Sequence, residues 1–263
     1  GFGESHAMSA KLIGALKKTA WVILIFLCAA FVIRAWESQR RIAPLQPWHT
    51  YVPAELSPKE MDAADWNGYL QHEAQLFKDV NTRMAEELDA SMRVATNRYN
   101  PDAPMHPGRL AYDWNRSYTL DPVGPPRGVA VMLHGLTDAP YSLRHVANRY
   151  REQGFAVVSI RMPGHGTVPG GLTKANWQDW MAATRLAVRE ARRRVGNDVP
   201  LHVVGYSNGG ALAMKYALDA IEDPKLARPD KLILISPMIG LTRFARFAGV
   251  ASWPAVFPAF AKA

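Results

Sequence analysis

The sequence contains one cysteine, Cys28, so it can form no internal disulfide and offers no cysteine cluster for zinc. Acidic side chains are also fewer than basic ones, 23 against 31, which gives a formal net charge of +8. The basic residues are spread along the chain without an RNA- or DNA-binding motif. We therefore expect no nucleic-acid partner.

The segment Gly205 to Gly209, with the sequence Gly-Tyr-Ser-Asn-Gly, is the strongest functional motif. It follows the apolar run 201–204 and precedes a stretch typical of a helix, which indicates a strand, a sharp turn and a helix in that order. Glycines on both sides of Ser207 allow two backbones to pass close beneath its hydroxyl. We therefore expect Ser207 to lie on a nucleophile elbow rather than on an ordinary turn.

A second motif provides the other half of an acyl-transfer site. The apolar run 128–133 ends in His134 and Gly135, as a buried parallel strand ends in a loop. One oxyanion donor is the backbone N–H after the nucleophile, here Asn208, and another comes from this loop, at Leu136 by position. We expect His134 to hold the loop through local hydrogen bonds rather than to act as the general base.

Strand and helix patterns alternate between these motifs and after them. Apolar runs at 155–160 and 232–235 indicate buried strands, and the stretches 139–153 and 176–194 indicate helices. Such alternation predicts an α/β fold with a mostly parallel sheet and helices on both faces. His165, in a Gly- and Pro-rich loop, has no companions at metal-ligand spacing, so we interpret that loop as structural.

Three motifs carry a resemblance to a known family. They are the His134-Gly135 turn, the loop 163–166 with Trp177, Asp179 and Trp180 after it, and the segment 205–209. Together they resemble α/β-hydrolases of the monoacylglycerol lipase, carboxylesterase and serine aminopeptidase-like group over residues 108–240. The resemblance implies Ser207 as nucleophile, the N–H groups of Leu136 and Asn208 as oxyanion hole, and an acyl-enzyme mechanism without metal or organic cofactor.

The sequence departs from that group near its C-terminus. In this fold the serine is followed along the chain by Asp or Glu and then by His. Asp230 is the last acidic residue and His202 the last histidine, so the triad acid and base are not in this chain. We expect residues 1–263 to be the front portion of a longer protein or one piece of a cleaved one, without the C-terminal strands, inactive alone and completed by a C-terminal polypeptide.

Residues 241–263 are rich in aromatic side chains. We expect this segment to begin a cap whose apolar face contacts substrate; core packing and membrane contact are the alternatives, because apolar pockets and cores look alike in sequence. The residues expected to contact substrate are Leu136, Tyr206, Phe244 and Phe247.

The N-terminal part has a different character. Residues 1–7 look like an expression scar, and residues 8–36 contain an apolar run from Thr19 to Ile33. This run is slightly short for a membrane span of about 20 residues. We favour an uncleaved signal anchor through residues 19–36 over a cleaved signal or a buried helix. In a bacterium such an anchor would place the hydrolase domain in the periplasm, at the inner membrane.

Residues 37–107 are predicted to be a linker and an accessory helical region. The Pro-rich stretch 40–53 is expected to be extended. Ser57 and Glu60 flank a proline in a capping-box pattern, so a helical stretch should run from about Pro58 towards Leu88 and pack on the hydrolase domain. Its apolar face should contain Trp66, Leu70, Ala74 and Phe77.

These patterns predict a membrane-anchored serine hydrolase that cleaves a carboxylic ester of a lipid or a short acyl chain. Hydrolysis of an amide or peptide by the same nucleophile is the alternative among enzymes. A catalytically silent, hydrolase-fold binding protein is the alternative outside them, which the absent acid and base support. One fold hosts many chemistries, so the substrate stays open.

Overall fold

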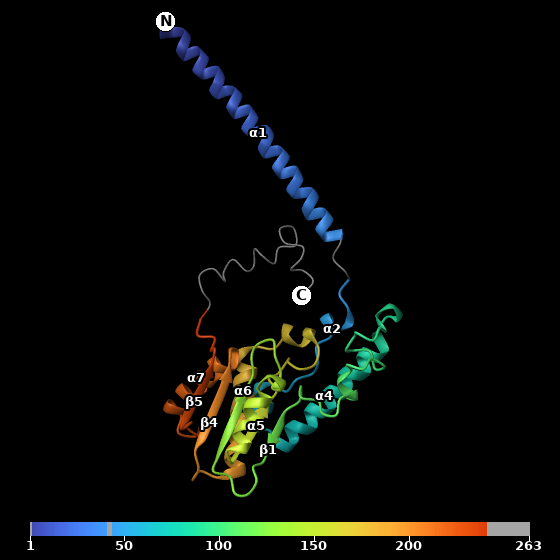
Figure 1. Ribbon diagram of the computed structural model, residues 1–263, viewed down its shortest axis with the longest axis vertical. Coiled ribbons are helices and arrows are strands. Elements are labelled where there is room, and N and C mark those ends of the chain that lie inside the picture. Colours follow the sequence, from blue (N-terminus) through green and yellow to red (C-terminus); the bar gives the residue numbers. More distant parts are fainter. Residues whose placement is uncertain (1, 41–43, 241–263) are drawn as a thin grey trace. The chain divides into compact units, whose positions relative to one another are not determined.

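The computed structural model describes residues 2–40 and 44–240, which fall into two compact units (Figure 1). The first unit contains helix α1 (Phe2–Arg40). Its segment Ile13–Glu37 has a mean hydropathy of 2.1 and is long and apolar enough to cross a membrane. A signal sequence near the N-terminus has the same length and composition, so the anchor stays a prediction.

The second unit, Leu45–Ile239, begins with helices and continues as alternating strands and helices. Its helices are α2 (Pro47–Thr50), α3 (Pro58–Ala63), α4 (Trp66–Glu87), α5 (Arg144–Glu152), α6 (Trp177–Val195) and α7 (Asn208–Glu222). Its strands are β1 (Tyr118–Leu120), β2 (Gly128–Leu133), β3 (Phe155–Ile160), β4 (Leu201–Tyr206) and β5 (Lys231–Ile235). Short 3-10 helices lie at Ala90–Met92, Pro107–Arg109, Pro140–Leu143 and Pro169–Thr173. The strands predicted at 128–133 and 155–160 are confirmed.

The five strands form one sheet in the order β1-β3-β2-β4-β5. Strands β2 to β5 are parallel, and β1 pairs with β3 in the antiparallel sense. β2 and β4 are neighbours, with Leu133 opposite Gly205 at their carboxyl ends. Ligands of open α/β sheets bind beyond these ends, so the two predicted motifs meet where a site is expected.

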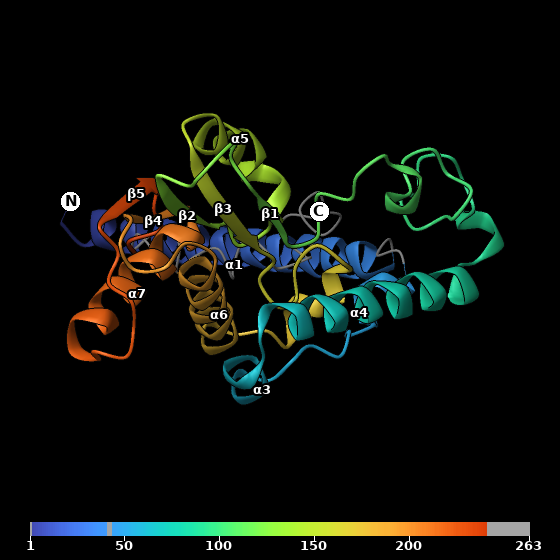
Figure 2. The same cartoon turned by 90° about the horizontal axis from the view of Figure 1, so that it is seen from below.

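Alternate residues of β2 face opposite sides of the sheet, because side chains of a strand point to its two faces in turn. Val129, Val131 and Leu133 pack with apolar residues of α6 and α7, and Ala130 and Met132 pack on the α5 side. Figure 2 shows α5 on one face of the sheet and α6 and α7 on the other. All six residues of β2 are buried. The predicted mostly parallel sheet with helices on both faces is therefore confirmed.

The strand predicted at 232–235 is confirmed, but its predicted burial is wrong for the described residues. Leu232 and Leu234 of β5 are 37% and 36% exposed, whereas Ile233 and Ile235 pack against the α5 side of the core. β5 is the outer strand of the described sheet and pairs there with β4 alone. One of its faces is therefore only partly covered.

The helical stretch predicted from about residue 58 to 88 is confirmed, and it is divided into the two helices α3 and α4. Ser57 and Glu60 form the expected capping box at the start of α3, but Asp65 starts α4 afresh by accepting a hydrogen bond from Gly68 N. The buried side chains of α4 are Trp66, Tyr69, Glu73, Leu76, Phe77, Val80 and Met84. The expected face is therefore wrong in part, since Ala74 is exposed and Leu70 is half-buried.

The extended linker expected over 40–53 is wrong in part, because residues 47–50 form α2, whereas residues 44–46 and 51–53 lie in neither helix nor strand. Trp48 stacks on Tyr99 with ring centroids 5.0 Å apart. A Cβ added to Gly170 would lie 2.2 Å from the carbonyl oxygen of Tyr51, so the chain after α2 runs directly against the 3-10 helix 169–173. The accessory region packs on the sheet domain as predicted, and it begins to do so before residue 53.

Candidate active site

Ser207 lies between β4 and α7 in a conformation that L-residues rarely adopt, with φ 52° and ψ −115°. Holding a non-glycine residue in such a region costs about 1–3 kcal/mol, and strain of this kind clusters at functional sites. The sharp strand-to-helix turn predicted at Ser207 is confirmed, and it carries the expected strain.

Glycines make the elbow possible because two backbones approach closely there. A Cβ added to Gly205 would lie 2.3 Å from the carbonyl oxygen of Gly209. A Cβ added to Gly209 would lie 2.0 Å from the carbonyl oxygen of Leu133. Neither position has room for a larger residue, which is the reason that the sequence places glycine on both sides of the serine.

The end of β5 holds the Ser207 backbone from both sides. Ser207 N donates to the carbonyl oxygen of Ile235 at 3.0 Å, and Met238 N donates to the carbonyl oxygen of Ser207 at 2.9 Å. Backbone groups make both bonds, so no side-chain pattern could have predicted them.

The loop that begins at Gly135 lies directly beside the elbow. A Cβ added to Gly135 would lie 3.5 Å from the Cβ of Ser207 and 3.3 Å from the Tyr206 ring. Asn208 is the first residue of α7, where backbone N–H groups have no acceptor within the helix and attract negative charge. The oxyanion roles expected of Leu136 and Asn208 stay predictions, made on two loops that meet at the serine.

His134 is 1% exposed and bridges two loops. Its Nε2 accepts a hydrogen bond from Met162 N at 3.0 Å, so its proton lies on Nδ1, which donates to the carbonyl oxygen of Gly135 at 2.9 Å. Burial and the neighbouring His165 lower the pKa of His134 to about 3. The expected local hydrogen bonding is confirmed, and both ring nitrogens are occupied.

His165 holds the next carbonyl of the same loop. Its Nε2 lies 2.5 Å from the carbonyl oxygen of Leu136, and its Nδ1 lies 3.0 Å from that of Pro163. Burial lowers the pKa of His165. A neutral imidazole carries one N–H, and the shorter contact assigns it to the bond with Leu136. The interpretation of the loop as structural is confirmed for this side chain.

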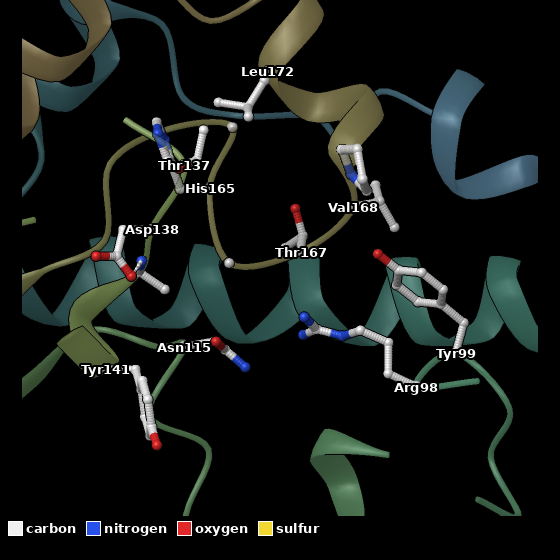
Figure 3. A pocket seen from close by; sticks show the side chains of 14 residues that line it. Arg98, Tyr99, Asn115, Thr137, Asp138, Tyr141, His165, Thr167, Val168 and Leu172 are labelled. Atoms are coloured by element: carbon white, nitrogen blue, oxygen red, sulfur yellow. Dashed lines mark hydrogen bonds between the residues drawn. The ribbon is translucent and has the colours of Figure 1, made fainter. Parts of the chain in front are cut away.

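A hollow of about 290 Å³ adjoins the loop on the side of Thr137 and Asp138. Figure 3 shows Arg98 and Tyr99 on one side of it and Thr137, Asp138 and Tyr141 on the other. Its lining is mixed, with a guanidinium, a carboxylate and hydroxyl groups. Among the residues that the structure describes, no group of three His, Cys, Asp or Glu side chains is placed to hold a metal ion.

The substrate contacts expected from the sequence are placed only in part. Leu136 and Tyr206 are 39% and 36% exposed, so both can touch a ligand at the elbow. Phe244, Phe247 and the cap segment 241–263 lie outside the described residues. Their contact with substrate stays a prediction.

Comparison with known proteins now decides the family. The family described as "Serine aminopeptidase, S33" matches residues 124–259, just over half of the chain. The chain belongs to this family of α/β-hydrolases. The chain is also similar to the thermostable monoacylglycerol lipase of Bacillus sp. (strain H-257), with 32% identity over 92 residues.

The similarities cover only part of each protein. The chain spans 35% of the length of the Bacillus lipase. The matched residues also make up 35% of the chain itself. A carboxyl esterase from Bacillus coagulans shares 22% identity at a TM-score of 0.39, covering 45% of this chain and 38% of the esterase. A monoglyceride lipase variant from Saccharomyces cerevisiae shares 16% identity at a TM-score of 0.44, and the match covers 52% of this chain and 45% of the lipase. Both scores are below 0.5, and the family assignment rests on the sequence match.

Proposed function

We propose that this protein is a serine hydrolase that cleaves a carboxylic ester of a lipid or a short acyl chain. The strained conformation of Ser207 supports this proposal most directly, because a protein that only binds a ligand has no need of a non-glycine residue at φ 52° in the elbow. Membership of an α/β-hydrolase family supports hydrolysis, and the similarity to a monoacylglycerol lipase supports a lipid ester.

The proposed reaction starts with attack of Ser207 Oγ on the ester carbonyl carbon, while its proton passes to a general base. The oxyanion of the tetrahedral intermediate accepts hydrogen bonds from the N–H groups of Leu136 and Asn208. Collapse breaks the ester bond, and the alcohol leaves with the proton from the base. Water then hydrolyses the acyl-serine in the same way, which releases the acid and restores the hydroxyl.

The general base of this proposal is neither His134 nor His165. Both imidazoles are bonded to the backbone, and burial lowers the pKa of each. We propose that the base and its acid partner lie beyond residue 263, because residues 231–263 contain no acidic residue and no histidine.

Hydrolysis of an amide or peptide is the second candidate, because the matching family is described as a serine aminopeptidase. The same nucleophile and oxyanion donors serve both reactions. The ratio of kcat/KM for p-nitrophenyl esters to that for aminoacyl p-nitroanilides separates the two candidates.

Intact-mass measurement after treatment with a fluorophosphonate probe tests the proposal. The 263-residue chain and the natural full-length protein are compared, each with a Ser207→Ala control. An adduct on the full-length protein that is absent from Ser207→Ala supports the proposal. A full-length protein that forms no adduct contradicts it and favours the binding protein.

We also propose that α1 anchors the enzyme in a bacterial inner membrane with the hydrolase domain in the periplasm. The length and hydropathy of the segment Ile13–Glu37 support an anchor. Protease added to intact spheroplasts should digest the hydrolase domain. A domain protected until the membrane is dissolved would reverse the orientation, and a protein of lower mass in the soluble fraction would indicate a cleaved signal.

A further inference from the structure

Arg161, directly after β3, has no exposed side-chain surface, and two carboxylates form ion pairs with its guanidinium. Its Nη1 and Nη2 donate to the two oxygens of Glu55 at 2.7 and 2.8 Å, and its Nε donates to Glu73 at 3.0 Å. Both acids belong to the accessory region, far from Arg161 in the sequence. We call Glu55, Glu73 and Arg161 the Arg161 cluster.

Polar groups satisfy the remaining bonding capacity of the cluster. Ser117 Oγ donates to Glu73 at 2.8 Å and accepts from Arg161 N at 2.8 Å. The Tyr69 hydroxyl donates to the carbonyl oxygen of Arg161 at 3.1 Å. Burial raises the pKa of Glu55, but the charge and hydrogen bonds of Arg161 outweigh it and the net pKa is lowered. The carboxylate is therefore ionised and committed to this contact at neutral pH.

The cluster also fixes the loop that follows Arg161. Arg161 Nη1 donates to the carbonyl oxygen of His165 at 3.0 Å, and Gly164 N donates to Glu55 at 2.7 Å. Gly164 and Gly166 have φ of 82° and 76°, so this backbone takes a shape that other residues disfavour. Glu55 bonds both the arginine and the loop, and it comes from outside the loop and its strand.

Two histidines connect this loop to the expected oxyanion donor. Met162 N bonds His134, which bonds the carbonyl oxygen of Gly135, while His165 bonds that of Leu136. The Gly135 carbonyl and the Leu136 N–H belong to one planar peptide and point in opposite directions. Holding the carbonyls on both sides of Leu136 therefore sets the direction of its N–H.

We propose that Glu55 is a positioning residue: through Arg161 and the loop 162–166 it aims the Leu136 N–H at the oxyanion. The accessory region is then part of the active-site support. This proposal rests on the proposed function for its catalytic consequence, while its structural content can be measured without activity. Small displacements near reacting atoms cost on the order of 100-fold in rate, and loss of one oxyanion donor costs on the order of 100- to 1000-fold.

The test compares Glu55→Gln with Asp62→Asn in the full-length protein. Asp62 in α3 also joins the accessory region to the core, through bonds of 2.8 and 2.7 Å to Arg185 of α6, and its ion-pair partners among the described residues are arginines of α6 rather than groups of the loop 162–166. Glu55→Gln keeps the size of the side chain and removes the charge. Hydrogen exchange measured by mass spectrometry reports on segments 134–138 and 162–166, and ester hydrolysis is followed in parallel.

We expect Glu55→Gln to speed exchange in both segments and to lower kcat by on the order of 10- to 100-fold at unchanged KM, because an oxyanion donor acts in the transition state. Asp62→Asn should change neither. Unchanged exchange at 134–138 in Glu55→Gln, or a rise in KM alone, overturns the proposal. If Glu55→Gln does not fold, Glu55→Asp takes its place. We then expect the same changes in hydrogen exchange and kcat, with smaller magnitudes.

The two proposals fail separately in this experiment. A wild-type protein that neither hydrolyses esters nor reacts at Ser207 removes the proposed function, and hydrogen exchange alone then decides whether Glu55 holds the loop. An active wild-type protein with an unaffected Glu55→Gln variant removes only the positioning role.

Discussion

Among the described residues, two groups of ion pairs join the accessory region to the hydrolase domain, one at Arg161 and one at Asp62, and their surroundings differ. In the Arg161 cluster the arginine is fully buried and Glu73 is nearly so. The pair between Asp62 and Arg185 is partly exposed, with 41% and 26% of the side chains accessible. Water screens the second pair and not the first, so contacts of similar length should differ widely in the free energy of unfolding that depends on them.

Arg161→Met removes the cation of the buried ion pairs and should have the largest effect on the free energy of unfolding. It leaves two carboxylates without their cation, which typically costs about 3–5 kcal/mol in the free energy of unfolding. Urea denaturation of the variant measures the loss. A loss below about 1 kcal/mol would mean that the acids are hydrated or protonated once the arginine is removed.

Acid should destabilise the fold through His134, which is buried and bonds the loop held by the Arg161 cluster. The pKa of His134 is about 3 in the folded protein and near 6.5 when unfolded, so only the unfolded state takes the proton in between. Stability is full above about pH 6.5 and falls as pH drops toward 3. At pH 5 this histidine should account for about 2 kcal/mol of the loss.

Urea denaturation at pH 7 and pH 5 checks this value. His134→Gln should lower the pH dependence by that amount. Equal slopes for wild type and His134→Gln would contradict the assigned protonation.

Ser57→Ala tests the helix that carries the exposed pair. Ser57 accepts a hydrogen bond from Glu60 N, and Glu60 bonds back to Ser57 N at 2.8 Å. Loss of such a cap typically costs about 1 kcal/mol. The thermal midpoint of Ser57→Ala should fall accordingly, with Ser57→Thr as the control that keeps the hydroxyl. Equal midpoints for the two variants would show that the cap contributes little here.

Asp62→Asn should have the smallest effect. Exposed ion pairs contribute about 0.2–1 kcal/mol, and salt weakens them further. The difference between Asp62→Asn and wild type should shrink in 1 M salt, while the effect of Arg161→Met should persist. A salt-insensitive loss above about 2 kcal/mol for Asp62→Asn would erase the contrast between the two pairs.

The sequence predicts the sheet domain well because its signals are local. The bounds of β3 agree with the apolar run at 155–160, and the N-cap of α6 at Asn176 agrees with the start of the predicted helix. The turn at Ser207 was predictable because two backbones approach so closely there that only glycine fits on either side of the serine, and those glycines are visible in the sequence. The role of His134 could also be deduced from local sequence, because it lies at the end of an apolar run and directly before Gly135.

Long-range contacts are the part that the sequence could not supply. Glu73 occupies a buried position of α4, and nothing in its neighbourhood names Arg161 as the partner that makes burial possible. The apolar spacing therefore pointed to Ala74 instead. The exposure of β5 depends on which elements lie beside it in space. The hydrogen bonds of Ile235 and Met238 to Ser207 are made by backbone groups, so they do not depend on residue type and could not be predicted from the sequence.

The Arg161 cluster also determines where this protein can be shortened. A fragment trimmed to residues 108–240 would keep every strand that the structure describes and the serine elbow, yet it would discard Glu55 and Glu73 and leave the guanidinium of Arg161 without either carboxylate. It would also uncover the apolar surface on which Trp66 now packs. Such a fragment should be recovered in inclusion bodies, whereas one that starts before Leu45 retains the whole compact unit.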